Sequence, residues 1–548
     1  MKVIIRFILS ALSFLIIQNI AHSQTEEILR PKLVVGIIVD QMRYDYLYKY
    51  YSKYLKNGFK KLLNEGFNCR NTNYNYEPTY TGPGHASIYT GTTPSQHGII
   101  SNDWYVRKTG KSNYVTDDST VTTIGSSNKA VGKMSPVNML ATTVTDELRL
   151  STNKKSKVIG VALKDRSSIL PAGHMANAAY WFNSETGNWV TSSYYMHDLP
   201  VWMKNFNDRH LTQKYLSQTW NTLFPIGEYT ESADDDNPYE GNYPGETKPV
   251  FPHNLSKMWK PDNFDIIRYT PFGNTLTKDA AIAAIEGEQL GKGTNTDFIA
   301  ISFSSTDYIG HKMGPQSIEL EDTYLRLDRD LSELITYLEK TYGKDEFLLF
   351  LTADHGAAYV PEQMMDLKIP AGYFDGKIFA DSLKNYLSKM YNANNLISYI
   401  INEQIYLNLS LIKQKNIPLK NIQEEIASFA LKFQGVANAY TAYQLNGEAL
   451  KNESANLIQN GFYKQRSGDV ALLLEPGWMQ WSHTGTTHGT SYNYDTHVPL
   501  LWYGWHINHG SSAVPVSITD IAPTISDLLN ISQPNATTGK VISDMLTK

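Results

Sequence analysis

Four runs of apolar residues recur along the chain, each five to seven residues long, at 33–39, 158–163, 298–303 and 347–351. Runs of this length and β-branched content predict strands that are buried on both faces, as in a parallel sheet. Polar residues follow each run within a few positions: Asp40; Lys164, Asp165 and Arg166; Asp307 and His311; Asp354 and His355. In open α/β sheets ligands bind beyond the carboxyl ends of the strands, so we expect these side chains to share one edge.

Helical spacing of apolar residues alternates with these runs and is found at 44–64, 81–90, 136–150, 279–291, 317–342 and 520–529. Leucines at helical spacing within 317–342 predict a helix packed on the core. Two long stretches, about 168–278 and 357–465, interrupt this rhythm, whereas 470–474 and 499–504 are predicted to return to the core. We expect an α/β fold with a mainly parallel central sheet, helices on both faces and two cap insertions.

Composition narrows the possible functions of the 548-residue chain. The net charge is −5 without a long basic stripe, which argues against nucleic-acid binding. Residues 1–23 have a short basic start, an apolar stretch over 7–17 and small residues before Gln24, which predicts a signal peptide cleaved near Ser23. We therefore expect an exported, periplasmic protein of residues 24–548 without stable membrane association. The single cysteine, Cys69, excludes an intrachain disulfide and is expected in the core.

Six residues form a candidate metal-binding set of three aspartates and three histidines: Asp40, Asp307, His311, Asp354, His355 and His488. Taken singly, each residue is better explained as a helix cap or as a hydrogen-bonded structural residue. Together they fall at predicted strand ends or in a Gly-flanked loop, which favours a site. Mixed carboxylate and imidazole ligands suit Zn²⁺ better than Mg²⁺ or Ca²⁺. Six ligands exceed one tetrahedral ion, so we expect two Zn²⁺ ions.

A segment rich in Gly and Pro, residues 77–87, offers candidate nucleophiles. Its hydroxyls belong to Thr79, Thr81 and Ser87. Thr81 lies at the predicted start of a short helix, where backbone amides and the helix dipole favour a phosphoryl oxygen. The alternative is that Thr81 is only an N-cap, a common role for threonine. Beside two metals, which clamp phosphoryl groups for in-line transfer, Thr81 becomes a candidate nucleophile.

Several motifs in combination resemble those of the alkaline phosphatase superfamily of two-zinc phosphohydrolases. The segments are Thr79-Tyr80-Thr81-Gly82-Pro83-Gly84-His85, His97-Gly98-Ile99-Ile100-Ser101-Asn102, Ser305-Thr306-Asp307-Tyr308-Ile309-Gly310-His311, Thr352-Ala353-Asp354-His355-Gly356, Thr487-His488-Gly489 and Thr519-Asp520-Ile521-Ala522-Pro523-Thr524. The resemblance spans about residues 32–540. Within the superfamily it is greatest to the phosphate-irrepressible periplasmic alkaline phosphatases, the monoesterase branch with a Thr nucleophile.

The resemblance implies a role for each matching residue. One zinc would be held by Asp40, Asp354, His355 and the Thr81 oxygen. The other would be held by Asp307, His311 and His488. Thr81 would attack phosphorus and form a covalent phospho-threonine. The non-bridging phosphoryl oxygens would be contacted by Asn102, Lys164 and Arg166, while His85 and His97 are expected to be structural and His483 only to lie behind the ligands.

The pair Lys164 and Arg166 separates the competing functions. A phosphate monoester carries two negative charges and a diester one, so a lysine and a forked arginine together favour a monoester. A nucleotide pyrophosphatase or phosphodiesterase is the alternative and would be expected to have an apolar pocket there. A sulfatase is disfavoured because the sequence after Cys69 lacks its motif. A secreted metal- or glycan-binding protein would explain the 36 Tyr and 10 Trp but not the ordered site residues. We expect small phosphate monoesters as substrates and a monomer.

Overall fold

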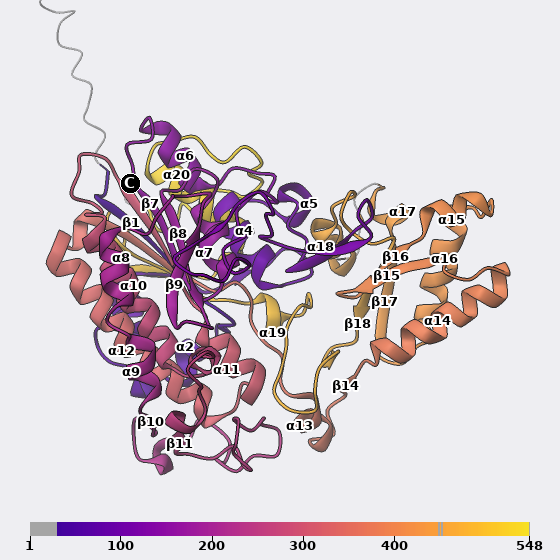
Figure 1. Ribbon diagram of the computed structural model, residues 1–548, viewed down its shortest axis with the longest axis horizontal. Coiled ribbons are helices and arrows are strands. Elements are labelled where there is room, and N and C mark those ends of the chain that lie inside the picture. The colour runs from indigo at the N-terminus through magenta and orange to yellow at the C-terminus, as the bar shows by residue number, and fades with distance from the viewer. Residues whose placement is uncertain (1–29, 448–449, 451–452, 547–548) are drawn as a thin grey trace, which may run out of the picture.

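The computed structural model describes residues 30–447, 450 and 453–546, and a sheet of ten strands lies at its centre (Figure 1). The residues of the predicted signal peptide, 1–23, lie outside this range. The strand order is β21 (Gly510–Ser512), β2 (Phe67–Cys69), β20 (Leu500–Gly504), β13 (Phe347–Thr352), β1 (Leu33–Val39), β12 (Asp297–Phe303), β7 (Val158–Ala162), β8 (Ala178–Asn183), β9 (Asn188–Ser192) and β6 (Thr123–Ile124).

The four predicted core strands lie side by side and run parallel. β1 pairs with β12 and with β13, and β12 pairs with β7. All residues of these strands are buried, as their continuous apolar sequence requires. Helices α4 (Thr81–Thr90) and α7 (Asp165–Ala172) cover one face, and α10 (Phe272–Gly287) and α12 (Ile318–Tyr342) cover the other (Figure 1). The predicted α/β fold with a mainly parallel sheet is confirmed.

A second, smaller sheet lies to one side of the main one and is orange in Figure 1. Its order is β15 (Ile397–Ile401), β16 (Gln404–Leu407), β18 (Val470–Leu474) and β17 (Val436–Thr441). Helices α14 (Gly376–Tyr391) and α16 (Leu419–Ala430) pack on it and share a separate apolar core. We call this unit the cap sheet. The prediction that 470–474 returns to the main core was wrong, because this strand pairs with β16 and β17.

Two other expectations differ from the structure. Residues 178–192, expected within a cap insertion, instead extend the main sheet, since β8 pairs in parallel with β7. The single helix predicted over 44–64 is broken into α2 (Tyr46–Lys49), a 3₁₀ turn at Tyr51–Lys53 and α3 (Phe59–Glu65). At the break, the carboxylate of Asp328 in α12 accepts hydrogen bonds from the amides of Leu55 and Phe59. Local periodicity gives no sign of this distant partner.

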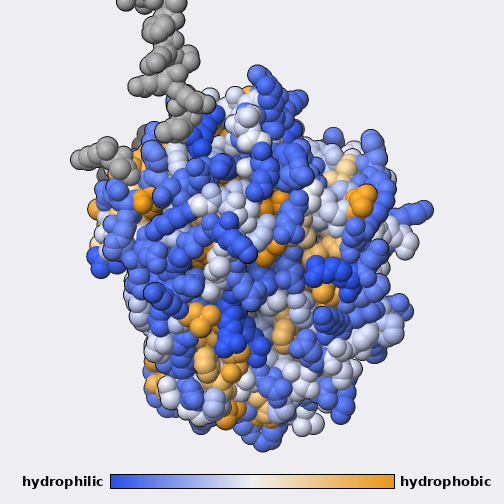
Figure 2. All heavy atoms as spheres, turned by 90° about the vertical axis from the view of Figure 1, so that its left-hand side faces the viewer, coloured by the Kyte–Doolittle hydropathy of each residue, from blue (hydrophilic) through white to orange (hydrophobic). Residues whose placement is uncertain are grey.

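Polar side chains cover most of the face of the molecule that lies away from the cap sheet, and apolar residues form small separate groups on it (Figure 2). Within the described part of the chain, no helix combines the length and the hydropathy needed to cross a bilayer. Cys69 is buried in the main core, as predicted.

Candidate active site

The carboxyl ends of the parallel strands bring four charged segments together, as the sequence predicts. Asp40 follows β1, Lys164 follows β7, and Asp307 lies in the first turn of α11 (Ser305–Met313), directly after β12. The Lys164 amine donates to Asp40 Oδ2 at 2.6 Å and to Asp307 Oδ2 at 2.5 Å. Three side chains separated by more than a hundred residues in sequence therefore meet at one edge of the sheet.

Three histidines lie around these carboxylates, and each has its Nδ1 atom next to a backbone carbonyl group. In His311, His355 and His488 the Nδ1 atom lies 2.7 to 3.0 Å from a backbone carbonyl oxygen. The Nε2 atoms lie near the carboxylates instead: His311 Nε2 is 3.1 Å from Asp307 Oδ1, and His355 Nε2 is 3.4 Å from Asp40 Oδ1. A carbonyl partner on one ring nitrogen fixes the tautomer that leaves the other nitrogen free as a ligand.

Two sets of ligand atoms are close enough to hold a cation. One set is Asp307, His311 and His488, and the other is Asp40, Asp307 and His355, with all atoms of a set within 4.8 Å of one another. Two carboxylate oxygens here, Asp40 Oδ1 and Asp354 Oδ2, are buried without a hydrogen-bond partner among the described residues. Buried carboxylates need a proton or a cation, so this donor set fits bound metal ions.

The charges at the edge are unbalanced. Burial and the negative charge of Asp307 raise the pKa of Asp40, and burial together with Asp40 raises the pKa of Asp354. Burial acts in the same direction on Asp307, but the positive charges of His311 and Lys164 outweigh it and hold that pKa well below its usual range. The raised pKa values of Asp40 and Asp354 show that their negative charges are not fully offset, so a bound cation would be stabilised there.

Thr81 is the first residue of α4 and borders the same site. Its Oγ1 lies 3.5 Å from Nε2 of His355. Gly91 directly follows the last residue of α4, and its φ of 68° is the left-handed conformation that glycine favours. The His85 Nδ1 atom lies 2.9 Å from the Thr81 carbonyl and its Nε2 atom 3.0 Å from Ser302 Oγ. The Thr81 hydroxyl therefore lies close to an imidazole of the site. His85 connects the first turn of α4 to β12 through its contacts with the Thr81 carbonyl and Ser302.

Asn102 and Arg166 are held by different partners. Asn102 Oδ1 accepts a hydrogen bond of 2.8 Å from the amide of Gly82, next to Thr81. Arg166 in α7 donates to the Tyr114 hydroxyl at 2.9 Å, and its buried Nε atom has no hydrogen-bond partner among the described residues. The guanidinium group of Arg166 thus has a hydrogen-bond donor that could bind a ligand oxygen.

Sequence reasoning missed Gln41. This residue follows Asp40 with a φ of 61°, donates from its amide to Asp354 Oδ1 at 3.1 Å and from Nε2 to Asp307 Oδ1 at 2.9 Å. It thereby ties two candidate metal ligands together. An uncharged residue directly after a strand gave no chemical signal by itself. His483, in contrast, is exposed and contacts Glu362.

The family model of "Type I phosphodiesterase / nucleotide pyrophosphatase" matches residues 34–499. That range contains the central strands and every residue of the site described above. The chain therefore belongs to this family, within the alkaline phosphatase superfamily that its motifs resemble.

Individual relatives match over nearly the whole length. The chain is 46% identical over 95% of its length to alkaline phosphatase PhoV of Synechococcus elongatus, with 94% of that protein covered. It is 45% identical to a Myroides odoratus protein named calcium-transporting ATPase, covering 95% of this chain and 96% of that one. Alkaline phosphatase PafA of Elizabethkingia meningoseptica is 43% identical over 98% of both chains.

The crystal structure of wild-type PafA superposes with a TM-score of 0.92 at 44% identity, covering 95% of this chain and 100% of that one. A second PafA structure carries substitutions of one Thr, one Asn, one Lys and one Arg. Murine ectonucleotide pyrophosphatase/phosphodiesterase 5 shares the fold at 15% identity and a TM-score of 0.51. The chain is thus an enzyme of the alkaline phosphatase type.

Proposed function

We propose that the protein is an exported alkaline phosphatase that hydrolyses phosphate monoesters with two zinc ions and Thr81 as nucleophile. One observation carries this proposal: the Lys164 amine is hydrogen-bonded to both Asp40 and Asp307. The Thr81 hydroxyl lies in the same group of side chains, next to His355. The site therefore combines a hydroxyl, carboxylates, imidazoles and positive charge within one edge. The named activity of PhoV and PafA and the four residue types replaced in the PafA variant support the same function.

The donor atoms divide into two proposed metal sites. Asp40, Asp354, His355 and the Thr81 oxygen would hold one ion. Asp307, His311 and His488 would hold the other. When bound, zinc lowers the pKa of a coordinated hydroxyl or water and offsets negative charge on phosphoryl oxygens.

The chain's own residues would supply the remaining steps. Thr81 Oγ1 would form a bond to phosphorus as the bond to the ester oxygen breaks, so that the alcohol leaves and a phospho-threonine remains. Water would then attack that phosphorus, and inorganic phosphate would leave Thr81 free again. Asn102, Lys164 and Arg166 would bind the non-bridging oxygens, and the amides at the start of α4 would favour the same negative charge.

Two charged groups for one phosphate distinguish the proposed activity from the alternative. A nucleotide pyrophosphatase or phosphodiesterase must accommodate a second substituent on phosphorus, whereas Lys164 and Arg166 suit the second negative charge of a monoester. The named phosphodiesterase 5 is a distant relative that shares only the fold at 15% identity. We therefore favour the monoesterase.

A comparison of three esters of one phenol tests this proposal. The purified protein, supplied with zinc, is assayed on the phosphate monoester, on its methyl phosphate diester and on the sulfate ester. We expect kcat/KM to be highest for the monoester. A higher value for the diester would assign the protein to the phosphodiesterases instead, and turnover only of the sulfate would refute both.

A further inference from the structure

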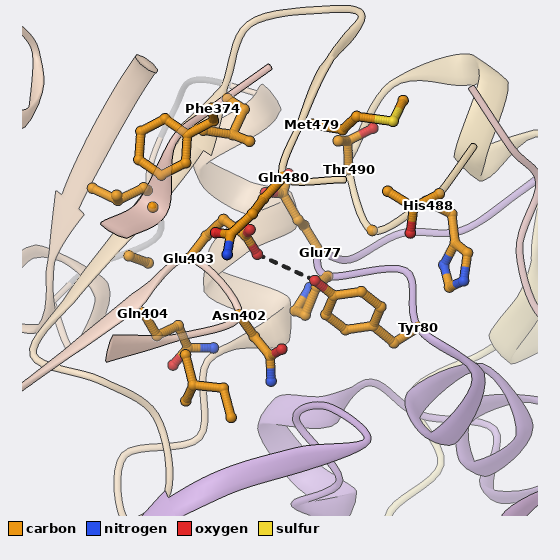
Figure 3. Close-up of a pocket in the computed structure, with 18 of the residues that line it drawn as sticks. Glu77, Tyr80, Phe374, Asn402, Glu403, Gln404, Met479, Gln480, His488 and Thr490 are labelled. Carbon is orange, nitrogen blue, oxygen red and sulfur yellow. Dashed lines mark hydrogen bonds between the residues drawn. The ribbon is translucent and has the colours of Figure 1, made fainter. Parts of the chain in front are cut away.

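A cavity of about 630 Å³ lies between the catalytic edge and the cap sheet. Asn102 and His488 line it on the catalytic side, and Asn402 and Glu403 line it on the cap side. Figure 3 shows His488, Asn402 and Glu403 around the cavity. A volume in this range is typical of pockets for small molecules. A phosphate group held beside Asn102 and His488 would therefore have its ester substituent next to this cavity.

The cap reaches the catalytic edge through one tight turn. Asn402 and Glu403, between β15 and β16, have φ of 51° and 57°, as in a two-residue hairpin with both central residues left-handed. Asn402 Nδ2 donates to Ser101 Oγ at 2.7 Å. The Tyr80 hydroxyl donates to Glu403 Oε2 at 3.1 Å (Figure 3). The turn thus contacts the sequence neighbours of Asn102 and Thr81.

Negative groups dominate the charge of the cavity wall. Glu77 and Glu403 both line it, and the buried Glu77 Oε2 atom has no hydrogen-bond partner among the described residues. A third carboxylate, Asp495, accepts hydrogen bonds through Oδ2 from the amides of Gly489 and Thr490, whereas its Oδ1 has no hydrogen-bond partner among the described residues. Lys377 also lines the cavity but is exposed at the start of α14. Within the described chain, no ion pair joins this lysine to either glutamate.

Burial raises the pKa of Glu77 to about 8 and raises the pKa of Glu403 above its usual value. A carboxylate in a partly dry wall acts on a ligand charge more strongly than one in open water, because the local dielectric is lower. Such a wall stabilises a positive ligand group and disfavours a negative one.

We propose, on the basis of the phosphomonoesterase function above, that this cavity receives the alcohol part of the ester and that Glu77 and Glu403 select for its charge. Alcohols that carry a positive charge or hydrogen-bond donors are favoured, and alcohols that carry a negative charge are disfavoured. The phosphate group would be bound by Asn102, Lys164 and Arg166, of which Lys164 and Arg166 do not line the cavity, so largely different residues would recognise the two parts of the substrate.

Three alkyl monoesters of similar size test the selection. Choline phosphate has a cationic alcohol, 3,3-dimethylbutyl phosphate is its neutral isostere, and 4-phosphooxybutanoate has an anionic one. The zinc-loaded enzyme is assayed at low ionic strength and at about pH 10, where an isolated carboxyl is ionised. We expect kcat/KM to fall in that order and to differ by at least tenfold between the first and the last. Added salt should reduce the difference in kcat/KM between the cationic and the anionic ester, because it screens their charges.

Glu403→Gln and Glu77→Gln identify the source of the selection, because glutamine keeps the shape and an acceptor oxygen but removes the charge. Each substitution is expected to reduce the ratio of kcat/KM for the cationic ester to kcat/KM for the anionic ester by roughly tenfold. Glu424→Gln is the matched control, since Glu424 is an exposed cap glutamate paired with Lys420 and does not line the cavity. It is expected to leave the ratio unchanged.

The outcomes separate this inference from the proposed function. If none of the three esters is hydrolysed, the monoesterase function fails. If the neutral ester is hydrolysed but the charged esters show no order, only the selection by the cavity fails. Equal losses on all three esters in Glu403→Gln and Glu77→Gln would also overturn the selection, because they would assign the glutamates to holding the fold around Tyr80.

Discussion

The Lys164 amine lies 2.6 Å from Oδ2 of Asp40, so the base that follows one strand is bonded to the acid that follows another. Both side chains are buried, with 1% and 0% of their surface exposed. A buried ion pair of this kind fixes the position of the lysine in the absence of a ligand. Lys164 is therefore held at the edge where the Thr81 hydroxyl also lies.

Removing this amine should impair monoester hydrolysis more than diester hydrolysis. We expect Lys164→Ala to lower kcat/KM for an aryl phosphate monoester by roughly 10²-fold or more, because the second negative charge loses a charged partner. Loss for the methyl diester should be at least tenfold smaller. Arg166→Ala is expected to act in the same direction. Equal losses on both esters would contradict the discrimination by charge.

Thr81 is the proposed nucleophile, and its hydroxyl should be required for monoester hydrolysis. Thr81→Ala should reduce kcat/KM on a monoester by roughly 10³-fold or more, whereas Thr81→Ser, which retains a hydroxyl, should keep a much larger share. Rapid acid quenching and mass spectrometry of the intact protein should detect a phosphoryl adduct in the parent enzyme and none in Thr81→Ala. An adduct that persists in Thr81→Ala would assign the nucleophile to another residue.

Metal removal should lower both activity and stability. Dialysis against a chelator leaves Asp40 Oδ1 and Asp354 Oδ2 buried without a hydrogen-bond partner among the described residues, so the apoprotein should melt at a lower temperature. A metal present at about a hundredfold its Kd contributes about 3 kcal/mol to unfolding free energy. Differential scanning calorimetry checks this independently of catalysis. Zn²⁺ should restore melting temperature and activity better than Ca²⁺ does, since three ligands are imidazoles. Full recovery with Ca²⁺ alone would contradict the choice of zinc.

The sequence predicts best those features that depend on a local pattern. The buried strands could be read from continuous apolar runs, and the placement of Asp40 and Lys164 at one edge followed from the geometry of parallel sheets. Gln41 could not be found in this way, because its role depends on a left-handed backbone and on contacts with Asp307 and Asp354. Likewise, 470–474 is as apolar as a core strand, and only its pairing partners place it in the cap sheet. The predicted limits of the two cap insertions are therefore wrong at 178–192, which extends the main sheet, and at 470–474, which belongs to the cap sheet, while their other limits stay predictions.

Asp330 on α12 should make stability depend on pH. Burial raises its pKa to about 7, above the value of about 3.9 expected in the unfolded chain, although Lys278 acts in the opposite direction. The folded state then binds the proton more tightly, so the contribution of this group is complete below about pH 4 and is lost as pH rises through about 7. Relative to Asp330→Asn, the parent protein should lose about 2 to 4 kcal/mol of unfolding free energy over that range.

Urea unfolding of both proteins at several pH values from about 4 to about 8 provides the measurement for Asp330. Each protein is compared with the other at the same pH, so that titration of the remaining groups cancels. Asn can still accept the 2.9 Å hydrogen bond that the Thr275 hydroxyl donates to Asp330. Parallel curves for the two proteins would show that Asp330 does not titrate differently on folding.

Asp328 should stabilise the fold by joining α12 to the broken segment before α3. Its Oδ2 atom accepts from the Leu55 amide at 2.5 Å and its Oδ1 atom from the Phe59 amide at 2.7 Å. Asparagine has only one acceptor oxygen, so Asp328→Asn leaves one amide facing a donor. We expect the free energy of unfolding, measured by urea denaturation, to fall by about 1–3 kcal/mol, which is the cost of an unsatisfied buried donor. Asp381→Asn, on the exposed side of α14, is the control and should change it by less than about 0.5 kcal/mol. Equal stability of the two variants would mean that the break in the helix is set by the local sequence rather than by Asp328.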